Sequence, residues 1–218
     1  MAAYSLQVLL PDELDGQLRR WATAQPRGTW PTWGGHLSLL ADFETALDPI
    51  VLAVRLERVC RRFHPFEIHL PRVVLDDYWG RPGFKIVMLM PAGRSTGGCS
   101  RLCRLRISAA RALGLDSSYL WEEAAGHRFT PHLSLTWGVP VAEAVALVEA
   151  ARIDAPTVRF NVDAIWLLGS VVTTHPTQIV RRIQRFRLGS GFSPQSSVIL
   201  AASPSVADPH SRSNRTTG

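Results

Sequence analysis

Short apolar stretches alternate with amphipathic ones along most of the chain, and this alternation predicts strands separated by helices. Acidic residues or a proline at the start of an amphipathic stretch are typical of a helix's first turn, whereas Gly and Pro bound the strands. The predicted strands are 4–10, 36–40, 66–75, 84–90, 132–137, 158–168 and 178–188. The predicted helices are 11–24, one starting at Asp48 and Pro49, 100–113, and one from Pro140 through Ala151.

The body of the chain nearly repeats itself. The tetrapeptide His-Leu-Ser-Leu occurs at 36–39 and again at 132–135, each time in a predicted strand that a helix and two long strands follow. The same tetrapeptide at the same rank in both halves favours two halves packed around a pseudo-twofold axis. We therefore expect an α+β fold that is bilobal, with two antiparallel-sheet lobes, helices outside and a central cleft between the lobes.

Composition sets the limits of this interpretation. The 218 residues, 46% hydrophobic and 19% charged, fit one domain with a sizeable core and exclude a disordered chain or a coiled coil. Residues 189–218 hold eight serines and three prolines, so we predict a folded domain over 1–188 and a disordered tail over 189–218.

The expected cellular location rests on two features that the sequence lacks. No stretch approaches the roughly 18 consecutive apolar residues of a membrane span, and the first 15 residues lack the basic region of a signal peptide. We expect a cytoplasmic protein without membrane association.

Arginine dominates the charge of the chain. Lys85 is the only lysine among the 24 basic residues, and the chain has 18 acidic residues. The arginine fork suits phosphate, so the basic balance is compatible with nucleic acid or phosphorylated ligands, although a GC-rich coding sequence explains it equally well. Four arginines of the last strand indicate an exposed basic edge, with an RNA-facing rim as the alternative: Arg181, Arg182, Arg185 and Arg187.

The repeated motif carries the candidate chemistry. Because strand side chains alternate, His36 and Ser38 share one face of their strand while the leucines between them point to the core, and His132 and Ser134 do the same in the second half. If the two polar faces meet across a cleft, two imidazoles and two hydroxyls converge on one small anion. Two histidines can then divide the base and acid work of cleaving a phosphodiester, while the hydroxyls hold the phosphate oxygens.

These motifs resemble those of the two-histidine (2H) phosphoesterases, within them the bacterial RNA 2′,3′-cyclic phosphodiesterases, or 2′-5′ RNA ligase-like proteins. Residues 129–135, Phe-Thr-Pro-His-Leu-Ser-Leu, are similar to the family's Phe-x-Pro-His-x-Thr-Leu. Residues 33–39, Trp-Gly-Gly-His-Leu-Ser-Leu, lack the usual proline before the histidine, and serine replaces the commoner threonine in both motifs. The likeness extends over residues 4–188 and includes Ala-Ile-Trp-Leu-Leu at 164–168.

The resemblance implies a metal-independent phosphoesterase that opens a 2′,3′-cyclic phosphate on RNA or a nucleotide to a 2′-phosphomonoester. It further implies that His132 activates the water, that His36 protonates the departing 3′ oxygen, and that Ser38 and Ser134 bind the phosphate. The nearly symmetric motifs by themselves leave acid and base unassigned. Two alternatives stay open: a non-catalytic RNA-binding module, and an enzyme that joins or cleaves 2′-5′ linkages.

Further residues and partners complete the expectation. Trp33, Arg128 and Phe129 flank the motifs and are candidates for a substrate rim, although core packing or solvation explains them about equally well. No set of residues has metal-ligand spacing, because Cys99 and Cys103 lack histidines at finger distance. We therefore expect no metal and no cofactor, a cyclic-phosphate RNA or nucleotide as the binding partner, and a monomer.

Overall fold

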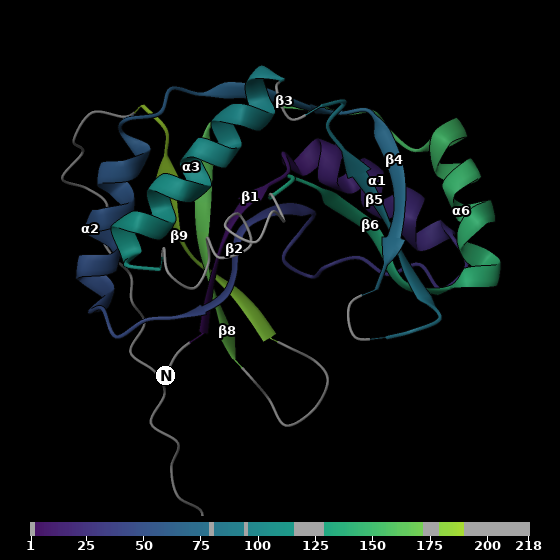
Figure 1. The fold of residues 1–218 in the computed structure, drawn as a ribbon, viewed down its shortest axis with the longest axis horizontal. Coiled ribbons are helices and arrows are strands. Elements are labelled where there is room, and N and C mark those ends of the chain that lie inside the picture. Colours follow the sequence, from purple (N-terminus) through teal and green to yellow (C-terminus); the bar gives the residue numbers. More distant parts are fainter. Residues whose placement is uncertain (1–2, 79–80, 94–95, 116–128, 172–178, 190–218) are drawn as a thin grey trace, which may run out of the picture.

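Antiparallel strands of three sheets form the framework of the fold (Figure 1). The computed structural model describes residues 3–78, 81–93, 96–115, 129–171 and 179–189. The strands are β1 (Ala3–Leu9), β2 (His36–Glu44), β3 (Phe66–Leu70), β4 (Arg72–Asp77), β5 (Phe84–Met90), β6 (Leu133–Pro140), β7 (Val158–Val162), β8 (Ala164–Val171) and β9 (Ile179–Arg187). The helices are α1 (Asp12–Ala24), α2 (Pro49–Cys60), α3 (Gly97–Leu113) and α6 (Val141–Asp154). The predicted tail lies outside the described residues from position 190 onward.

Local sequence signals set the helix ends. At the start of α2 the Asp48 carboxylate accepts a 2.8 Å hydrogen bond from the Ile50 amide, and Pro49 occupies the first helical turn. At the end of α3, Gly114 adopts φ 74°, a left-handed conformation that glycine tolerates best. These signals were readable in the sequence, so the predicted helices lie where expected.

Two predicted strands are wrong in the same way, because each is in fact two strands. The stretch 66–75 divides at Pro71 into β3 and β4, and the stretch 158–168 divides at Asp163 into β7 and β8. Proline has no amide proton for a ladder, so Pro71 marks the point where the chain leaves one sheet for another. β3 and β7 pair with each other in a two-stranded sheet, whereas β4 and β8 continue into the larger sheets.

The two larger sheets exchange strands between the halves of the chain. The element order β2-α2-β3-β4-β5 repeats as β6-α6-β7-β8-β9. However, the β4–β5 hairpin of the first half pairs with β6 of the second, in the sheet order β4-β5-β6. The β8–β9 hairpin of the second half joins β2 of the first through β1, in the sheet order β2-β1-β8-β9. Each large sheet therefore contains strands from both halves.

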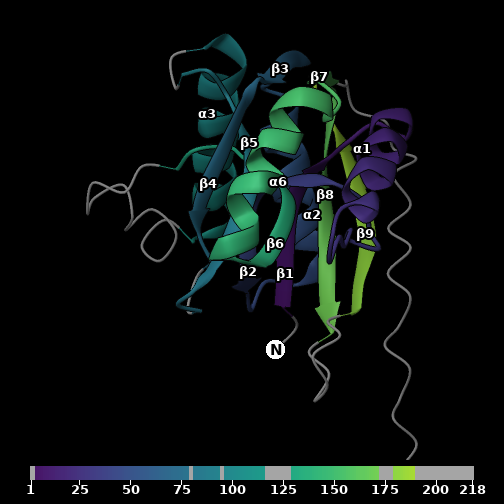
Figure 2. The same ribbon diagram turned by 90° about the vertical axis from the view of Figure 1, so that its right-hand side faces the viewer.

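The helices cover these sheets from outside. α2 and α3 pack on each other and contact β9 and β2 respectively, whereas α6 packs on β4, β5 and β6, as Figure 2 shows from the side. The α+β class with antiparallel sheets is thus confirmed, while the pseudo-twofold relation between two lobes stays a prediction. None of the described helices combines the length and the apolar character needed to cross a membrane.

The motif leucines are buried as their alternation predicts. Leu37, Leu39, Leu133 and Leu135 are at most 2% exposed and belong to one hydrophobic core. Their burial fixes the opposite direction for the histidines and serines that alternate with them.

Candidate functional site

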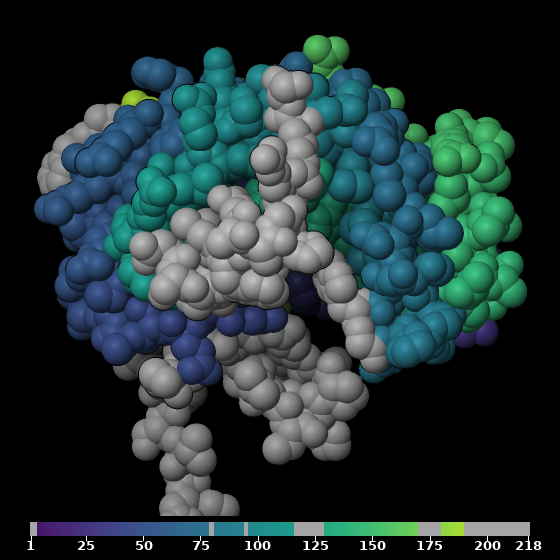
Figure 3. Space-filling model, in the orientation of Figure 1, coloured from purple at the N-terminus to yellow at the C-terminus, as the bar shows by residue number. Residues whose placement is uncertain are grey.

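The two histidine motifs meet where the two large sheets adjoin. β2 is the end strand of the four-stranded sheet, β6 is the end strand of the three-stranded sheet, and the two strands contact each other. His36 is the first residue of β2, and His132 immediately precedes β6. A positive charge on His132 lowers the pKa of His36, so the two imidazoles interact electrostatically. Near these strands the surface is hollowed between the α2–α3 side and the β4–β5 side (Figure 3).

Both imidazoles are held in the same way. Nδ1 of His36 lies 3.0 Å from the Gly34 carbonyl oxygen, and Nδ1 of His132 lies 3.2 Å from the Thr130 carbonyl oxygen. A carbonyl oxygen can only accept, so Nδ1 carries the proton in each ring. In the neutral state each ring therefore presents its lone pair at Nε2, the tautomer that a general base acting through Nε2 needs.

Four influences act on the protonation of His36. Burial is the largest and lowers its pKa below the ordinary 6.5, because the imidazolium is poorly solvated there. The hydrogen bond to the Gly34 carbonyl raises the pKa, the charge of His132 lowers it, and the Asp15 carboxylate raises it. The net effect is a lowered pKa, so the neutral ring is favoured near neutral pH.

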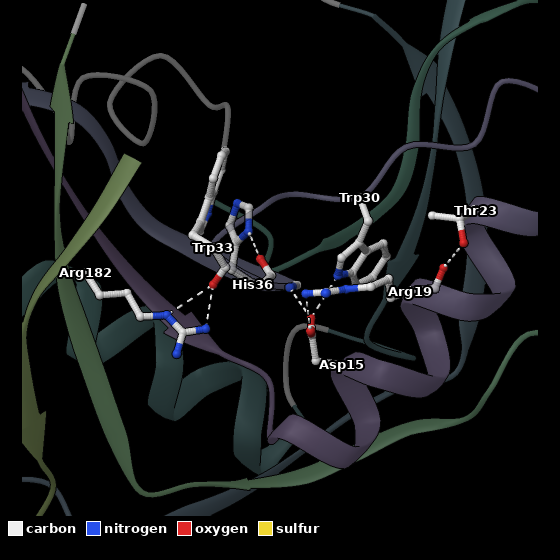
Figure 4. Close-up of polar contacts among 9 residues, drawn as sticks. Asp15, Arg19, Thr23, Trp30, Trp33, His36 and Arg182 are labelled. Atoms are coloured by element: carbon white, nitrogen blue, oxygen red, sulfur yellow. Dashed lines mark hydrogen bonds and ion pairs between the residues drawn. The ribbon is translucent and has the colours of Figure 1, made fainter. Parts of the chain in front are cut away.

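The loop before His36 is fastened from two sides (Figure 4). From α1, Oδ1 of Asp15 accepts hydrogen bonds from the Gly35 amide and from Nε1 of Trp30, the latter at 2.9 Å. From β9, the Arg182 guanidinium donates two hydrogen bonds, at 3.2 and 2.7 Å, to the Trp33 carbonyl oxygen. An anion and a cation from distant elements therefore fix the backbone that positions His36.

The two glycines of this loop explain the missing proline of the first motif. Gly34 adopts φ +107°, and a Cβ atom at Gly35 would lie 2.5 Å from the Trp30 ring and 2.7 Å from Leu10. A proline at 35 would also remove the amide proton that Asp15 accepts. The local structure thus requires a small residue with an amide proton directly before His36.

The predicted rim residues have different surroundings. The Trp33 ring lies 5.5 Å from the His36 ring, centroid to centroid, and its Nε1 donates to Oε1 of Gln7 at 3.2 Å. The Phe129 ring lies 4.7 Å from the guanidinium carbon of Arg106, whose Nε donates to the Leu39 carbonyl at 3.1 Å. Arg128 lies outside the described residues. Trp33 is therefore in direct contact with a candidate catalytic ring, whereas Phe129 packs beside a buried arginine.

The two motif serines lie on β2 and β6. Ser38 and Ser134 are half-buried, and their hydroxyls make no hydrogen bond to any described residue. Each follows its histidine by two positions, so it lies on the same side of its strand. The contact between β2 and β6 and the interaction of the two rings bring the two motifs near each other. Two imidazoles and two hydroxyls are a set suited to binding and protonating an oxyanion.

The sequence analysis did not identify three residues that make contacts in this region. Asp15 was readable only as an acid in a helix's first turn, and Arg182 only as one of several arginines on an edge strand. The sequence did contain a sign that Arg106 is buried and paired. It lies among the apolar positions Leu102, Leu105 and Ala109 of α3, where a charged side chain requires a partner. Over the described ranges, no three His, Cys, Asp or Glu side chains gather as a metal site would require.

Comparisons with known proteins agree with this fold. A family model described as the 2′-5′ RNA ligase superfamily matches residues 10–173. The structure of Escherichia coli LigT complexed with 3′-AMP is similar, with a TM-score of 0.58 and 19% identity over 87% of this chain and 99% of that one. LigT complexed with phosphate has a TM-score of 0.55 and 16% identity over 87% of this chain and 98% of that one. The Thermus thermophilus protein TT0787 has a TM-score of 0.53 and 16% identity over 87% and 100% of the two chains. At these identities the structural likeness establishes the fold alone. A comparison with curated protein sequences found no match.

Proposed function

The chain belongs to the 2′-5′ RNA ligase superfamily of two-histidine phosphoesterases, and from this premise we propose that it hydrolyses 2′,3′-cyclic phosphates at RNA ends or on nucleotides. The product is a 2′-phosphomonoester. Water supplies the attacking oxygen and neither a metal nor a cofactor is needed, because two imidazoles can carry out both proton transfers.

The proposed reaction divides the protons between the two rings. Nε2 of His132 takes a proton from water as the water oxygen bonds to phosphorus, and the bond from phosphorus to the 3′ oxygen breaks. Nε2 of His36 then gives its proton to the departing 3′ oxygen. The hydroxyls of Ser38 and Ser134 donate hydrogen bonds to the non-bridging oxygens, on which negative charge increases in the transition state.

The observation that supports this proposal is the matched geometry of the two histidines. Each ring has its Nδ1 held by the carbonyl two residues before it, and the two rings interact electrostatically. Burial lowers the pKa of His36 in the free protein, but a phosphodiester anion between the rings favours the protonated form. Substrate binding therefore raises the pKa of His36 towards the range in which it can act as the acid.

Hydrolysis of 2′,3′-cyclic AMP in the presence of EDTA tests the proposal, with the phosphomonoester product identified by ³¹P NMR. We expect turnover with EDTA, and a loss in kcat of about 10² or more in His36→Ala and in His132→Ala. His69→Ala is the control, because this exposed histidine lies on β3 in the two-stranded sheet. Near wild-type turnover in His36→Ala or in His132→Ala would contradict the mechanism, and so would complete loss of wild-type activity with EDTA.

Two outcomes would redirect the assignment. Retention of cyclic-ended RNA without turnover would support the binding-module alternative. Exclusive action on 2′-5′ dinucleotides would support the 2′-5′ esterase or ligase alternative, the chemistry after which the family is named. A cytoplasmic location and a monomeric state stay predictions.

A further inference from the structure

A row of side chains crosses the four-stranded sheet from the candidate catalytic strand to its opposite edge. Gln7 of β1 pairs with Ser38 of β2 on one side and with Trp166 of β8 on the other, and Trp166 pairs with Arg185 of β9. Directly opposed residues of antiparallel strands project from the same face. Because neighbouring strands lie about 4.8 Å apart, Trp166 is roughly 10 Å from Ser38 along this row.

Two arginines surround the Trp166 ring. The guanidinium carbons of Arg182 and Arg185 lie 5.4 and 6.0 Å from the ring centroid. Arg182 also donates to the Trp33 carbonyl through Nε and one amino group, which leaves its other amino group for a ligand. The ion pair between Arg185 and Asp163 is solvent-exposed on both sides, so it competes only weakly with an incoming phosphate.

A pocket of about 390 Å³ opens beside this tryptophan. Its lining includes Trp166, Arg182, Arg185 and Leu9, and Leu9 pairs with His36 across β1 and β2. Asp12 and Asn161 also line it, and their side chains make no hydrogen bond to a described residue. The volume lies within the roughly 300–1,000 Å³ typical of small-molecule pockets.

We propose that Trp166, Arg182 and Arg185 form a second nucleotide subsite, which binds the RNA nucleotide preceding the cyclic end. The inference rests on the proposed function, because the cyclic phosphate must occupy the two-histidine site. The base stacks on the exposed part of the Trp166 ring, and the arginines contact the phosphate that links this nucleotide to the last one. The preferred substrate is then an RNA end and not a free cyclic mononucleotide.

Chain-length dependence tests the subsite. The values of kcat/KM are measured for a 2′,3′-cyclic mononucleotide and for di-, tri- and hexaribonucleotides with the same cyclic end. Wild-type protein should prefer the oligonucleotides. Trp166→Leu and Arg185→Gln should each reduce that preference about tenfold, mainly through KM, which is the scale of losing one base stack or phosphate contact.

Two control variants separate this role from a structural one. Trp166→Phe keeps an aromatic face and should restore most of the preference. Arg181→Gln removes the same charge from the same strand. Arg181 pairs with Gly169, whereas Arg182 pairs with the adjacent residue Leu168, so Arg181 lies on the opposite face of the sheet. Its replacement should therefore leave the preference intact.

The outcomes distinguish the subsite from the enzyme itself. A wild-type protein that hydrolyses mononucleotides and oligonucleotides equally well would overturn the subsite and leave the proposed function standing. Equal losses on all substrates in Trp166→Leu would also overturn it, because the tryptophan would then act on the scissile nucleotide or on the fold. A wild-type protein that hydrolyses neither substrate would refute the proposed function instead.

Discussion

Asp15 joins α1 to the loop before His36 by hydrogen bonds, and replacing it should affect both stability and the protonation of His36. One carboxylate oxygen accepts from the Gly35 amide and from Trp30 Nε1, and the other pairs with Arg19. The Asp15 side chain is only 14% exposed, whereas that of Arg19 is 51% exposed. The two hydrogen bonds on the first oxygen therefore contribute more than the ion pair.

The expected magnitude follows from these contacts. Asp15→Ala leaves two donors without their charged acceptor at about 1.5 kcal/mol each, so the free energy of unfolding should fall by about 3 kcal/mol. Asp15→Asn keeps an acceptor oxygen and should cost about 1 kcal/mol. The carboxylate raises the pKa of His36, so its removal in Asp15→Asn should lower that pKa further.

Urea unfolding measures the first effect, and an NMR pH titration of the His36 ring measures the second. Glu13→Gln is the matched control, because this exposed acid lies in the same helical turn. An Asp15→Ala protein within about 0.5 kcal/mol of wild type, below the contribution of one typical hydrogen bond, would refute the role of the two bonds. A His36 pKa that rises in Asp15→Asn would refute the electrostatic reasoning.

Three further predictions concern the same region and the core. Gly35→Ala should destabilise the protein by about 1–3 kcal/mol in urea unfolding, because its Cβ would lie 2.5 Å from Trp30, whereas Gly93→Ala, with open space around it, should not. Because the pKa of His36 lies below its ordinary 6.5, the unfolded chain binds this proton more tightly. The free energy of unfolding should therefore decrease as the pH falls below about 6.5, and His36→Gln should flatten this decrease; an unchanged slope would contradict it. Burial, with a smaller contribution from Glu57, raises the pKa of Cys60 to about 12, so at pH 8 roughly one thiol in 10⁴ is ionised. Mass spectrometry should find Cys60 alkylated by iodoacetamide only after unfolding, and labelling in the native state would disprove its burial.

The sequence predicted those features that depend on neighbouring residues. Strand alternation was enough to bury Leu37 and Leu133 and to direct His36 and His132 away from the core, because the period of two is local. Capping by Asp48 and termination by Gly114 are local for the same reason.

Contacts between distant residues could not be predicted. The hydrogen bond from Gly35 to Asp15 spans 20 positions and that from Arg182 to Trp33 spans 149, and no local pattern encodes either pairing. The breaks at Pro71 and Asp163 were missed because apolar residues continue on both sides, so each stretch resembles one long strand. The exchange of hairpins between the halves follows from these breaks and was missed with them.

That exchange affects how the protein reaches its native state. A nascent chain that ends before β6 contains β4 and β5 without their third strand, and β1 without β8. Such unpaired edges are prone to intermolecular association, and pairing strands so far apart in the chain slows folding. The strand that follows His132 pairs with β5 of the first half, and the loop before His36 is held by Arg182 of β9. That loop therefore gains its last contacts only after synthesis of the last strand.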